Sequence, residues 1–179
     1  MKKKKKILSI ILLIIVLLIA SVIIIVFACF NKIKSEQKNA EVILNEDGSK
    51  KALILYQDSL FSLTKKIINE TSIMLSENDY SVTMNHPRSD LTYNVSDYDI
   101  VILATPVYAS NVAKPILDYG KNNDFNNTSV IVIVTGQIID ETSEIEEIIE
   151  NVNNPKEIKG IKINGITDDF KTFINENIN

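Results

Sequence analysis

The first thirty residues differ from the rest of the chain in their pattern of apolar and polar positions. Five lysines precede an unbroken run over residues 7–30 that contains no charge, proline or glycine. At ~1.5 Å per residue, a helix over this run would be about 36 Å long, enough to cross a hydrocarbon core of ~30 Å. The run also lacks the polar stripe of a helix that lies on a soluble core. The pattern therefore predicts one transmembrane helix, an anchor over residues 1–30.

Two fates of this anchor stay open. The apolar run is longer than the ~7–15 residues typical of a signal-peptide core, which favours an uncleaved helix. Val26-Phe27-Ala28-Cys29 resembles a lipoprotein-type signal, in which a small residue precedes a cysteine at the end of the apolar run. In that alternative Cys29 would carry the lipid and begin the mature chain. Either form tethers the remaining residues to membrane lipid.

The distribution of lysines predicts which side of the membrane the remainder occupies. Lys2 to Lys6 precede the apolar run, whereas Lys32, Lys34 and Lys38 follow it. Cytoplasmic flanks carry the excess of positive charge in membrane proteins. We therefore expect a single-pass protein whose N-terminus is cytoplasmic and whose remaining residues are extracytoplasmic.

Beyond the anchor, a polar stretch precedes an alternation of strand and helix patterns. Residues 31–50 predict a linker, with a turn signal at 46–49. The domain is expected over residues 51–179. Short apolar runs predict five buried strands, at 52–56, 80–84, 99–104, 130–134 and 158–163. Helical spacing predicts helices over 63–77, from Pro115 to Gly120, over about 143–152 and from Thr167 onward, with a loop over 85–96.

This alternation predicts an α/β domain. Strands that alternate with helices form right-handed βαβ units and a parallel sheet covered on both faces. We expect a doubly wound five-stranded parallel sheet of strand order 2-1-3-4-5. In such a sheet the ligand crevice lies at the carboxyl ends of the first and third strands. The loops 57–63 and 105–111 are therefore the candidate site.

Charge and composition narrow the function classes. Without the five N-terminal lysines, 14 Lys and Arg stand against 23 Asp and Glu, a net charge of −9. No nucleic-acid partner is expected, because phosphate backbones are bound by basic surfaces. One cysteine and one histidine exclude an intramolecular disulfide and a His/Cys zinc site. His86 lies in Asn85-His86-Pro87 and is interpreted as a turn residue, and no side chain stands out as a catalytic base or nucleophile.

The two loops carry the candidate chemistry. Hydroxyls at Ser59, Ser62 and Thr64 lie where a helix begins, and the free N–H groups and dipole of a helix start attract phosphate. In the alternative interpretation, Ser62 only caps that helix. The second loop contains Tyr108 directly after a buried strand. Its ring could lie against a flat aromatic ligand, or it could pack under the following helix.

Residues 51–179 resemble the flavodoxin family. The resemblance rests on 51–56 with 59–64 and on 98–109, above all on Thr105-Pro106-Val107-Tyr108, while Thr135-Gly136-Gln137 matches the family's third FMN-contacting loop. In the family's phosphate loop a hydroxyl stands at the position of Phe61 and a glycine at that of Ser62. The resemblance implies a flavodoxin-like fold with FMN as cofactor and Tyr108 covering its ring. The cofactor-binding residues that it implies are Ser59, Ser62, Leu63, Thr64, Thr105, Pro106, Val107, Tyr108, Thr135, Gly136 and Gln137.

Two functions follow from this resemblance. One is a membrane-tethered FMN-binding redox protein, which transfers electrons or reduces a small acceptor while the flavin performs the chemistry. Its redox partner, a protein or a small acceptor, is not identified by the sequence. The other is a flavodoxin-like fold that has lost flavin and serves as a binding or scaffold module, because a fold by itself does not determine a function.

Overall fold

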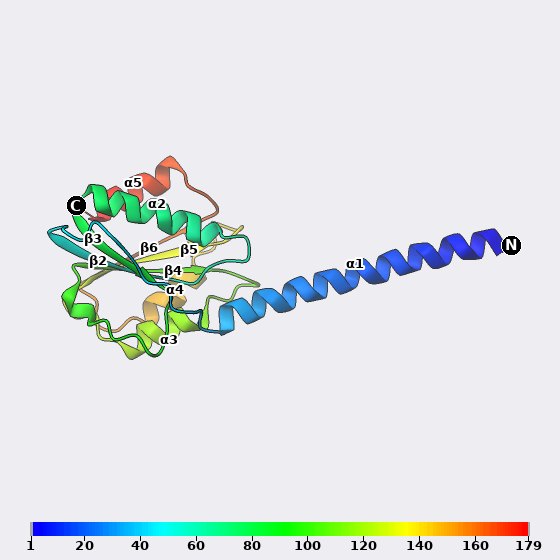
Figure 1. The fold of residues 1–179 in the computed structure, drawn as a ribbon, viewed down its shortest axis with the longest axis horizontal. Helices are drawn as coiled ribbons and strands as arrows, with labels where there is room; N and C mark the ends of the chain where they lie inside the picture. Colours follow the sequence, from blue (N-terminus) through cyan, green and yellow to red (C-terminus); the bar gives the residue numbers. More distant parts are fainter. Residues whose placement is uncertain (1, 179) are drawn as a thin grey trace.

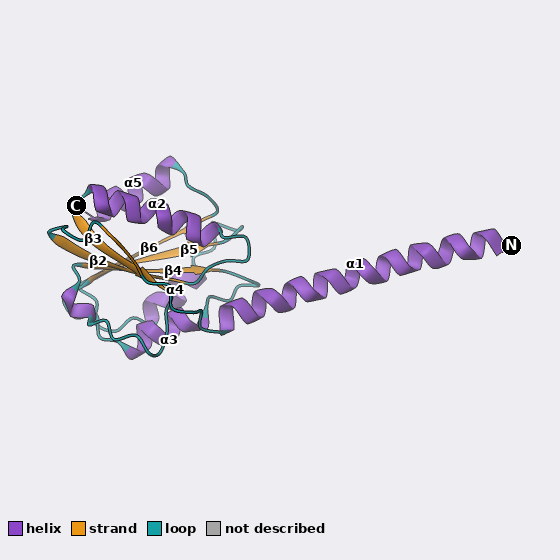
Figure 2. Cartoon of the chain, in the orientation of Figure 1, coloured by secondary structure: helices purple, strands orange, loops and turns teal. Residues whose placement is uncertain are grey.

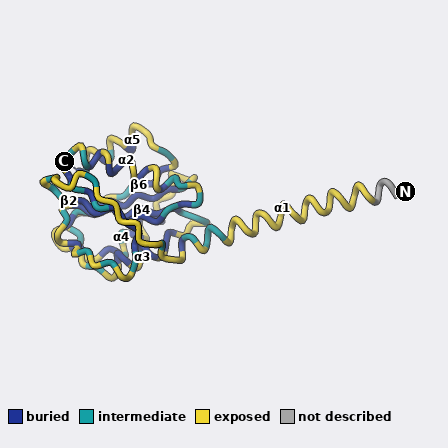
Figure 3. The backbone as a smooth tube through the Cα atoms, in the orientation of Figure 1, coloured by how far each residue is buried: buried dark blue, intermediate teal, exposed yellow. Residues whose placement is uncertain are grey.

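A long helix leads into an α/β domain (Figure 1). The computed structural model describes the backbone of residues 2–178 and the side chains of residues 6–178. Helix α1 spans Lys2–Lys34 and, among the described residues, is the one helix long and apolar enough to cross a membrane. Most of its length stands clear of the domain with its side chains exposed (Figure 3). The finding agrees with the predicted apolar helix.

Six strands form one mixed sheet in the order β1-β3-β2-β4-β5-β6 (Figure 2). Strand β1 runs antiparallel to β3, and the other neighbouring strands run parallel. The strands are β1 Val42–Leu44, β2 Lys50–Tyr56, β3 Tyr80–Asn85, β4 Ile100–Pro106, β5 Ser129–Thr135 and β6 Glu157–Ile163.

The prediction of a five-stranded, wholly parallel sheet is therefore wrong. The five predicted strands are parallel and keep the expected relative order, but β1 adds a sixth, antiparallel strand at the edge beside β3. This strand has three residues, Val42 to Leu44, which favour a strand but are too few to show the two-residue period of one. Its pairing with β3 covers backbone groups that an edge strand would otherwise leave open.

Helices cover both faces of the sheet. Figure 1 shows α2 and α5 on one face and α3 and α4 on the other. Their bounds are α2 Leu63–Glu77, α3 Lys114–Asn122, α4 Ser143–Glu150 and α5 Asp168–Ile178, and a short 3₁₀ helix, Val95–Asp97, lies in the region between β3 and β4. Gly120 was expected to end α3 but lies inside it. A Cβ atom there would lie 3.0 Å from the carbonyl oxygen of Asn151, so the glycine allows α3 to pack against the end of α4.

Alternate residues of the central strands point to opposite faces and form two apolar clusters. In β2, Ala52 and Ile54 pack in the cluster under α2 and α5, whereas Leu53 and Leu55 pack in the cluster under α3 and α4. This alternation is the two-residue period of a strand buried on both faces. It explains why the strands read as continuous apolar runs.

The last turn of α1 is packed against the domain. Ile33 is buried in the apolar cluster under α3. Gln57, the residue after β2, is also buried, and its Nε2 donates to the carbonyl of Ser35 at 3.0 Å and to that of Lys32. Carbonyls at a helix C-terminus lack partners within the helix, and Gln57 supplies one. Residues 31–50, predicted as a linker, thus contain the end of α1 and strand β1.

Candidate functional site

Three loops at the carboxyl ends of β2, β4 and β5 carry most of the residues predicted for the site. They are residues 57–62, 107–113 and 136–142. Because neighbouring parallel strands end at the same edge of a sheet, the three loops lie beside one another. Helix α1 meets the domain at the same edge (Figure 1).

In the first loop, two of the three predicted phosphate-binding hydroxyls point into the protein. Ser59 is buried, and its Oγ accepts the backbone N–H of Thr64 at 3.3 Å. Thr64 is fully buried, and its Oγ1 lies 2.8 Å from Oγ1 of Thr135. Ser59 therefore caps α2 in the way proposed for Ser62, whose side chain makes no capping hydrogen bond.

Ser62 adopts a backbone conformation that suits glycine. Its φ of 55° and ψ of 23° lie in the left-handed region, which costs a residue with a side chain on the order of 1 kcal/mol. This is the position at which the resemblance expects glycine, so the chain keeps the turn despite the substitution. The neighbouring Phe61 is exposed. Leu63 begins α2 and is half-buried.

The second loop is a tight hairpin that begins at Tyr108. The backbones of Tyr108 and Asn111 exchange two hydrogen bonds of 3.1 Å. Ala109 and Ser110 between them have φ values of 49° and 56°, the positive values of a two-residue hairpin turn. Thr105 stands at the base of this loop, fully buried, and its Oγ1 accepts the N–H of Ala113 at 2.9 Å.

The side chain of Tyr108 reaches across to the first loop. Its hydroxyl accepts the backbone N–H of Leu60 at 2.7 Å. Burial raises the pKa of the Tyr108 phenol, so the hydroxyl stays protonated at neutral pH. One of the N–H groups of the predicted phosphate loop is thus already bonded to the residue predicted to cover the flavin ring. The separation of 48 positions hid this contact from sequence reasoning.

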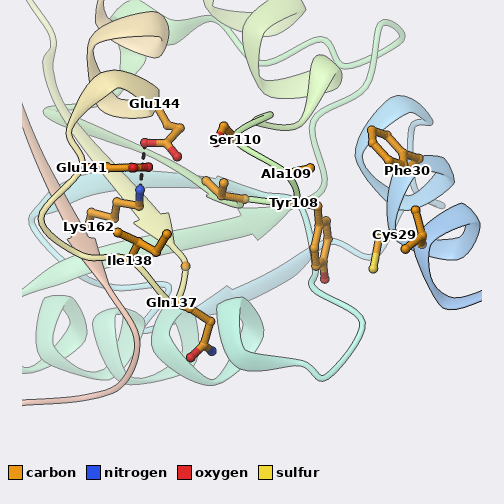
Figure 4. Close-up of a pocket in the computed structure, with 13 residues that line it drawn as sticks. Cys29, Phe30, Tyr108, Ala109, Ser110, Gln137, Ile138, Glu141, Glu144 and Lys162 are labelled. Atoms are coloured by element: carbon orange, nitrogen blue, oxygen red, sulfur yellow. Dashed lines mark hydrogen bonds and ion pairs between the residues drawn. The ribbon is translucent and has the colours of Figure 1, made fainter. Parts of the chain in front are cut away.

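A cavity of about 400 Å³ lies between the second and third loops (Figure 4). Four of the predicted site residues line it: Val107, Tyr108, Gly136 and Gln137. The other predicted residues do not line the cavity in the described part of the chain. They are Thr105, Pro106 and Thr135, at the ends of β4 and β5, and the four in the segment 59–64. The wall opposite the domain is formed by α1 through Val26, Cys29 and Phe30, a contribution that the sequence did not indicate.

A buried ion pair closes the other end of the cavity. Nζ of Lys162 on β6 lies 2.8 Å from Oε2 of Glu144 at the start of α4, and each side chain is 2% exposed. In Figure 4, Tyr108 lies between this pair and Cys29 and Phe30 of α1. Burial by itself would raise the pKa of Glu144, but the hydrogen bonds to its carboxylate and the charge of Lys162 together outweigh burial and lower that pKa. The cavity therefore has mostly apolar walls and one polar end, at which the charges of Lys162 and Glu144 balance and Glu141 adds a further carboxylate.

His86 is a packed residue rather than the expected turn residue. It follows β3, is buried, and its Nδ1 lies 2.7 Å from the carbonyl oxygen of Tyr56. Burial lowers its pKa, which keeps the ring neutral at pH 7. In the described part of the chain, no three His, Cys, Asp or Glu side chains gather into a group that could hold a metal ion.

Comparison with known proteins places this geometry in a fold. No protein-family model matches the sequence, and no curated protein sequence matches it. Solved structures do match. A flavodoxin of Streptococcus pneumoniae TIGR4 is 15% identical, with a TM-score of 0.55 over 72% of this chain and 94% of that chain. Oxidised flavodoxin 1 of Bacillus cereus is 14% identical, with a TM-score of 0.50 over 72% and 95%.

An NADH:FMN oxidoreductase in its apo form is likewise similar. It is 14% identical, with a TM-score of 0.55 over 73% of this chain and 87% of that chain. At these identities the likeness concerns the fold. The chain thus carries a flavodoxin-like domain behind an N-terminal apolar helix.

Proposed function

We propose that this chain is a membrane-tethered redox protein that binds FMN at the carboxyl edge of its flavodoxin-like sheet. The cavity carries the proposal, because Tyr108 and Gly136 line it from two separate loops. These are the loops that the resemblance assigns to the flavin ring. Flavodoxins and an NADH:FMN oxidoreductase among the structural neighbours support a flavin-related function.

The residues of the cavity fit a flat aromatic group. The ring would lie against Tyr108, with Val107, Gly136 and Gln137 around it. A Cβ atom at Gly136 would lie 3.3 Å from Cε of Lys162, so glycine keeps this side of the cavity open. Pockets for ligands of this size typically occupy ~300–1,000 Å³ and are mostly apolar with a few polar groups, as here.

The phosphate would be held mainly by the backbone at the start of α2. Free N–H groups and the helix dipole favour an anion there, and Ser62 adds a hydroxyl. The N–H of Leu60 becomes available when Tyr108 releases it. The side chains of Ser59 and Thr64 point into the protein and support this loop. In the described conformation neither hydroxyl is available to a phosphate.

FMN, when bound, supplies one- and two-electron redox chemistry. The chain's own part is to bind the group, orient it and exclude water. The apolar side chains of α1 and Val107 would limit the access of water to a ring bound in the cavity. Lys162, held by Glu144, keeps further N–H donors at the polar end, where a carbonyl or ring nitrogen of a ligand could accept them.

We further propose that α1 is an uncleaved anchor, with the N-terminus in the cytoplasm and the domain outside. The lysines before the apolar run support this orientation. Protease added to intact cells is then expected to release the domain, and protection until lysis would reverse the orientation. The mass of the purified protein separates the uncleaved chain from a lipidated one that begins at Cys29.

Flavin titration tests the cofactor. The full chain, purified in detergent and freed of any flavin, is expected to quench FMN fluorescence saturably. No saturation at about 100 μM FMN would exclude even micromolar affinity and reject the proposal. That outcome would leave the second candidate, a flavodoxin-like module without flavin, which the inward-pointing hydroxyls of Ser59 and Thr64 favour.

A further inference from the structure

Large apolar side chains are exposed at one edge of the domain. Phe61 is 83% exposed, Ile138 60%, Ile139 47% and Ile166 43%. They lie on the loops that follow β2, β5 and β6. These strands belong to the parallel part of the sheet, in which β5 pairs with β6 and β4 lies between β2 and β5. All four therefore lie at the carboxyl edge of the sheet. Exposed apolar side chains that gather in this way mark an interaction surface.

Helix α1 leaves the domain from the same edge. Figure 1 shows it extending in the direction in which these loops project. Val26 and Phe30 of α1 line one cavity together with Ile138. Phe61 is close to the same place, because the neighbouring Leu60 is hydrogen-bonded to Tyr108 of that cavity.

The end of α1 is held against the domain by packing and hydrogen bonds, before residues 35–41 lead to β1. The helix is unbroken to Lys34, Ile33 is buried in the domain, and Gln57 binds the last carbonyls of the helix. A helix held in this way sets the distance of the domain from the membrane. The exposed loops therefore stay at a fixed distance from the last turn of α1.

The length of the apolar run places the domain end of α1 at the membrane surface. A helix over residues 7–30 is about 36 Å long and exceeds a ~30 Å hydrocarbon core by about one turn. Val26 to Phe30, the turn of α1 that lines the cavity, is then at the level of the headgroups, and the last turn with Ile33 follows it. The loops beside it reach the same level, where apolar side chains enter the boundary to a depth of about 5–10 Å.

We propose that the carboxyl edge of the sheet docks on the lipid surface through Phe61, Ile138 and Ile139. Charges of both signs flank these side chains, Asp140 and Glu141 after Ile139 and Lys65 and Lys66 after Phe61, so apolar insertion into zwitterionic lipid, rather than attraction to charged headgroups, drives the contact. The candidate cavity consequently lies against the membrane. The inference rests on the membrane anchor in the proposed function and is independent of FMN.

Tryptophan fluorescence tests the docking directly, because the chain contains no tryptophan. Single variants Phe61→Trp and Ile138→Trp are placed, as the full chain, in phosphatidylcholine vesicles brominated near the top of the acyl chains. We expect blue-shifted emission that the bromines quench. Ile73→Trp is the matched control, because Ile73 is 47% exposed but lies on α2, and its emission is expected to remain unquenched.

A fourth variant, Leu17→Trp in the middle of α1, measured in phosphatidylcholine vesicles brominated near the ends of the acyl chains, separates failure of docking from failure of the anchor. Quenching at position 17 without quenching at 61 and 138 overturns the docking and leaves the anchor intact. No quenching at position 17 overturns both. A blue shift at 61 that depends on protein concentration but not on bromine indicates a second copy of the chain on this surface, and also overturns the proposal.

Discussion

Replacing Lys162 by methionine is expected to lower the free energy of unfolding by about 3–5 kcal/mol. The substitution keeps most of the side-chain volume but leaves the carboxylate of Glu144 buried without its partner. Urea unfolding of the full chain in detergent, followed by circular dichroism, measures the change. No other charged pair among the described residues is buried to this degree, so breaking any of the other ion pairs is expected to cost less.

The control removes both charges. Lys162→Met combined with Glu144→Leu is expected to restore stability close to that of the wild type, because the desolvation cost disappears together with the attraction. A double variant as unstable as the single one would contradict this account.

The lowered pKa of Glu144 also sets a pH dependence of stability. The stabilising contribution of Glu144 is present above the unfolded pKa of about 4.3 and is lost as pH falls through the lower folded pKa.

Replacing Tyr108 by alanine is expected to weaken FMN binding by about 30- to 2,000-fold. Loss of stacking accounts for roughly 0.5–1.5 kcal/mol, and loss of apolar cover for roughly 1.5–3 kcal/mol. Flavin fluorescence titration of the full chain measures the affinity. An unchanged affinity would mean that the ring lies elsewhere than against Tyr108.

Tyr108→Phe is the matched control. It keeps the aromatic face but removes the hydroxyl that accepts the N–H of Leu60. We expect an affinity equal to or above that of the wild type, because the phosphate no longer competes with Tyr108 for that N–H group. If phenylalanine weakens binding as much as alanine does, the hydroxyl rather than the ring face contributes the affinity.

The elements that local pattern determines were predictable. Helix α2 spans Leu63–Glu77, as its spacing of apolar residues predicts, and Phe170 N–H bonds to Oγ1 of Thr167 where the last helix was expected to begin. The buried runs of β2, β4 and β5 became the central strands. In each case a segment shows its burial in its own periodicity, because one face of a helix or both faces of a strand must be apolar.

Elements that depend on a distant partner were missed or misread. Strand β1 forms because it pairs with β3, about forty positions along the chain, and its three apolar residues are too few to define a strand by themselves. In the sequence Gly120 is typical of a helix end, whereas in the fold it allows α3 to approach the end of α4 closely. Ser59 and Thr64 have the hydroxyls of a phosphate loop, but in the fold Ser59 bonds to the N–H of Thr64 and Thr64 bonds to Thr135, and a linear sequence does not show on which side a hydroxyl lies.

The sequence by itself determined the apolar helix, the α/β alternation and the loops in which a ligand site was to be sought, because these follow from the order of apolar and polar residues. Only the tertiary structure decided what stands around the cavity. The wall formed by α1, the Lys162–Glu144 pair and the bond from Leu60 to Tyr108 join residues from separate elements. A linear pattern records how buried a side chain must be, whereas its partner is chosen when the chain folds and brings distant segments together.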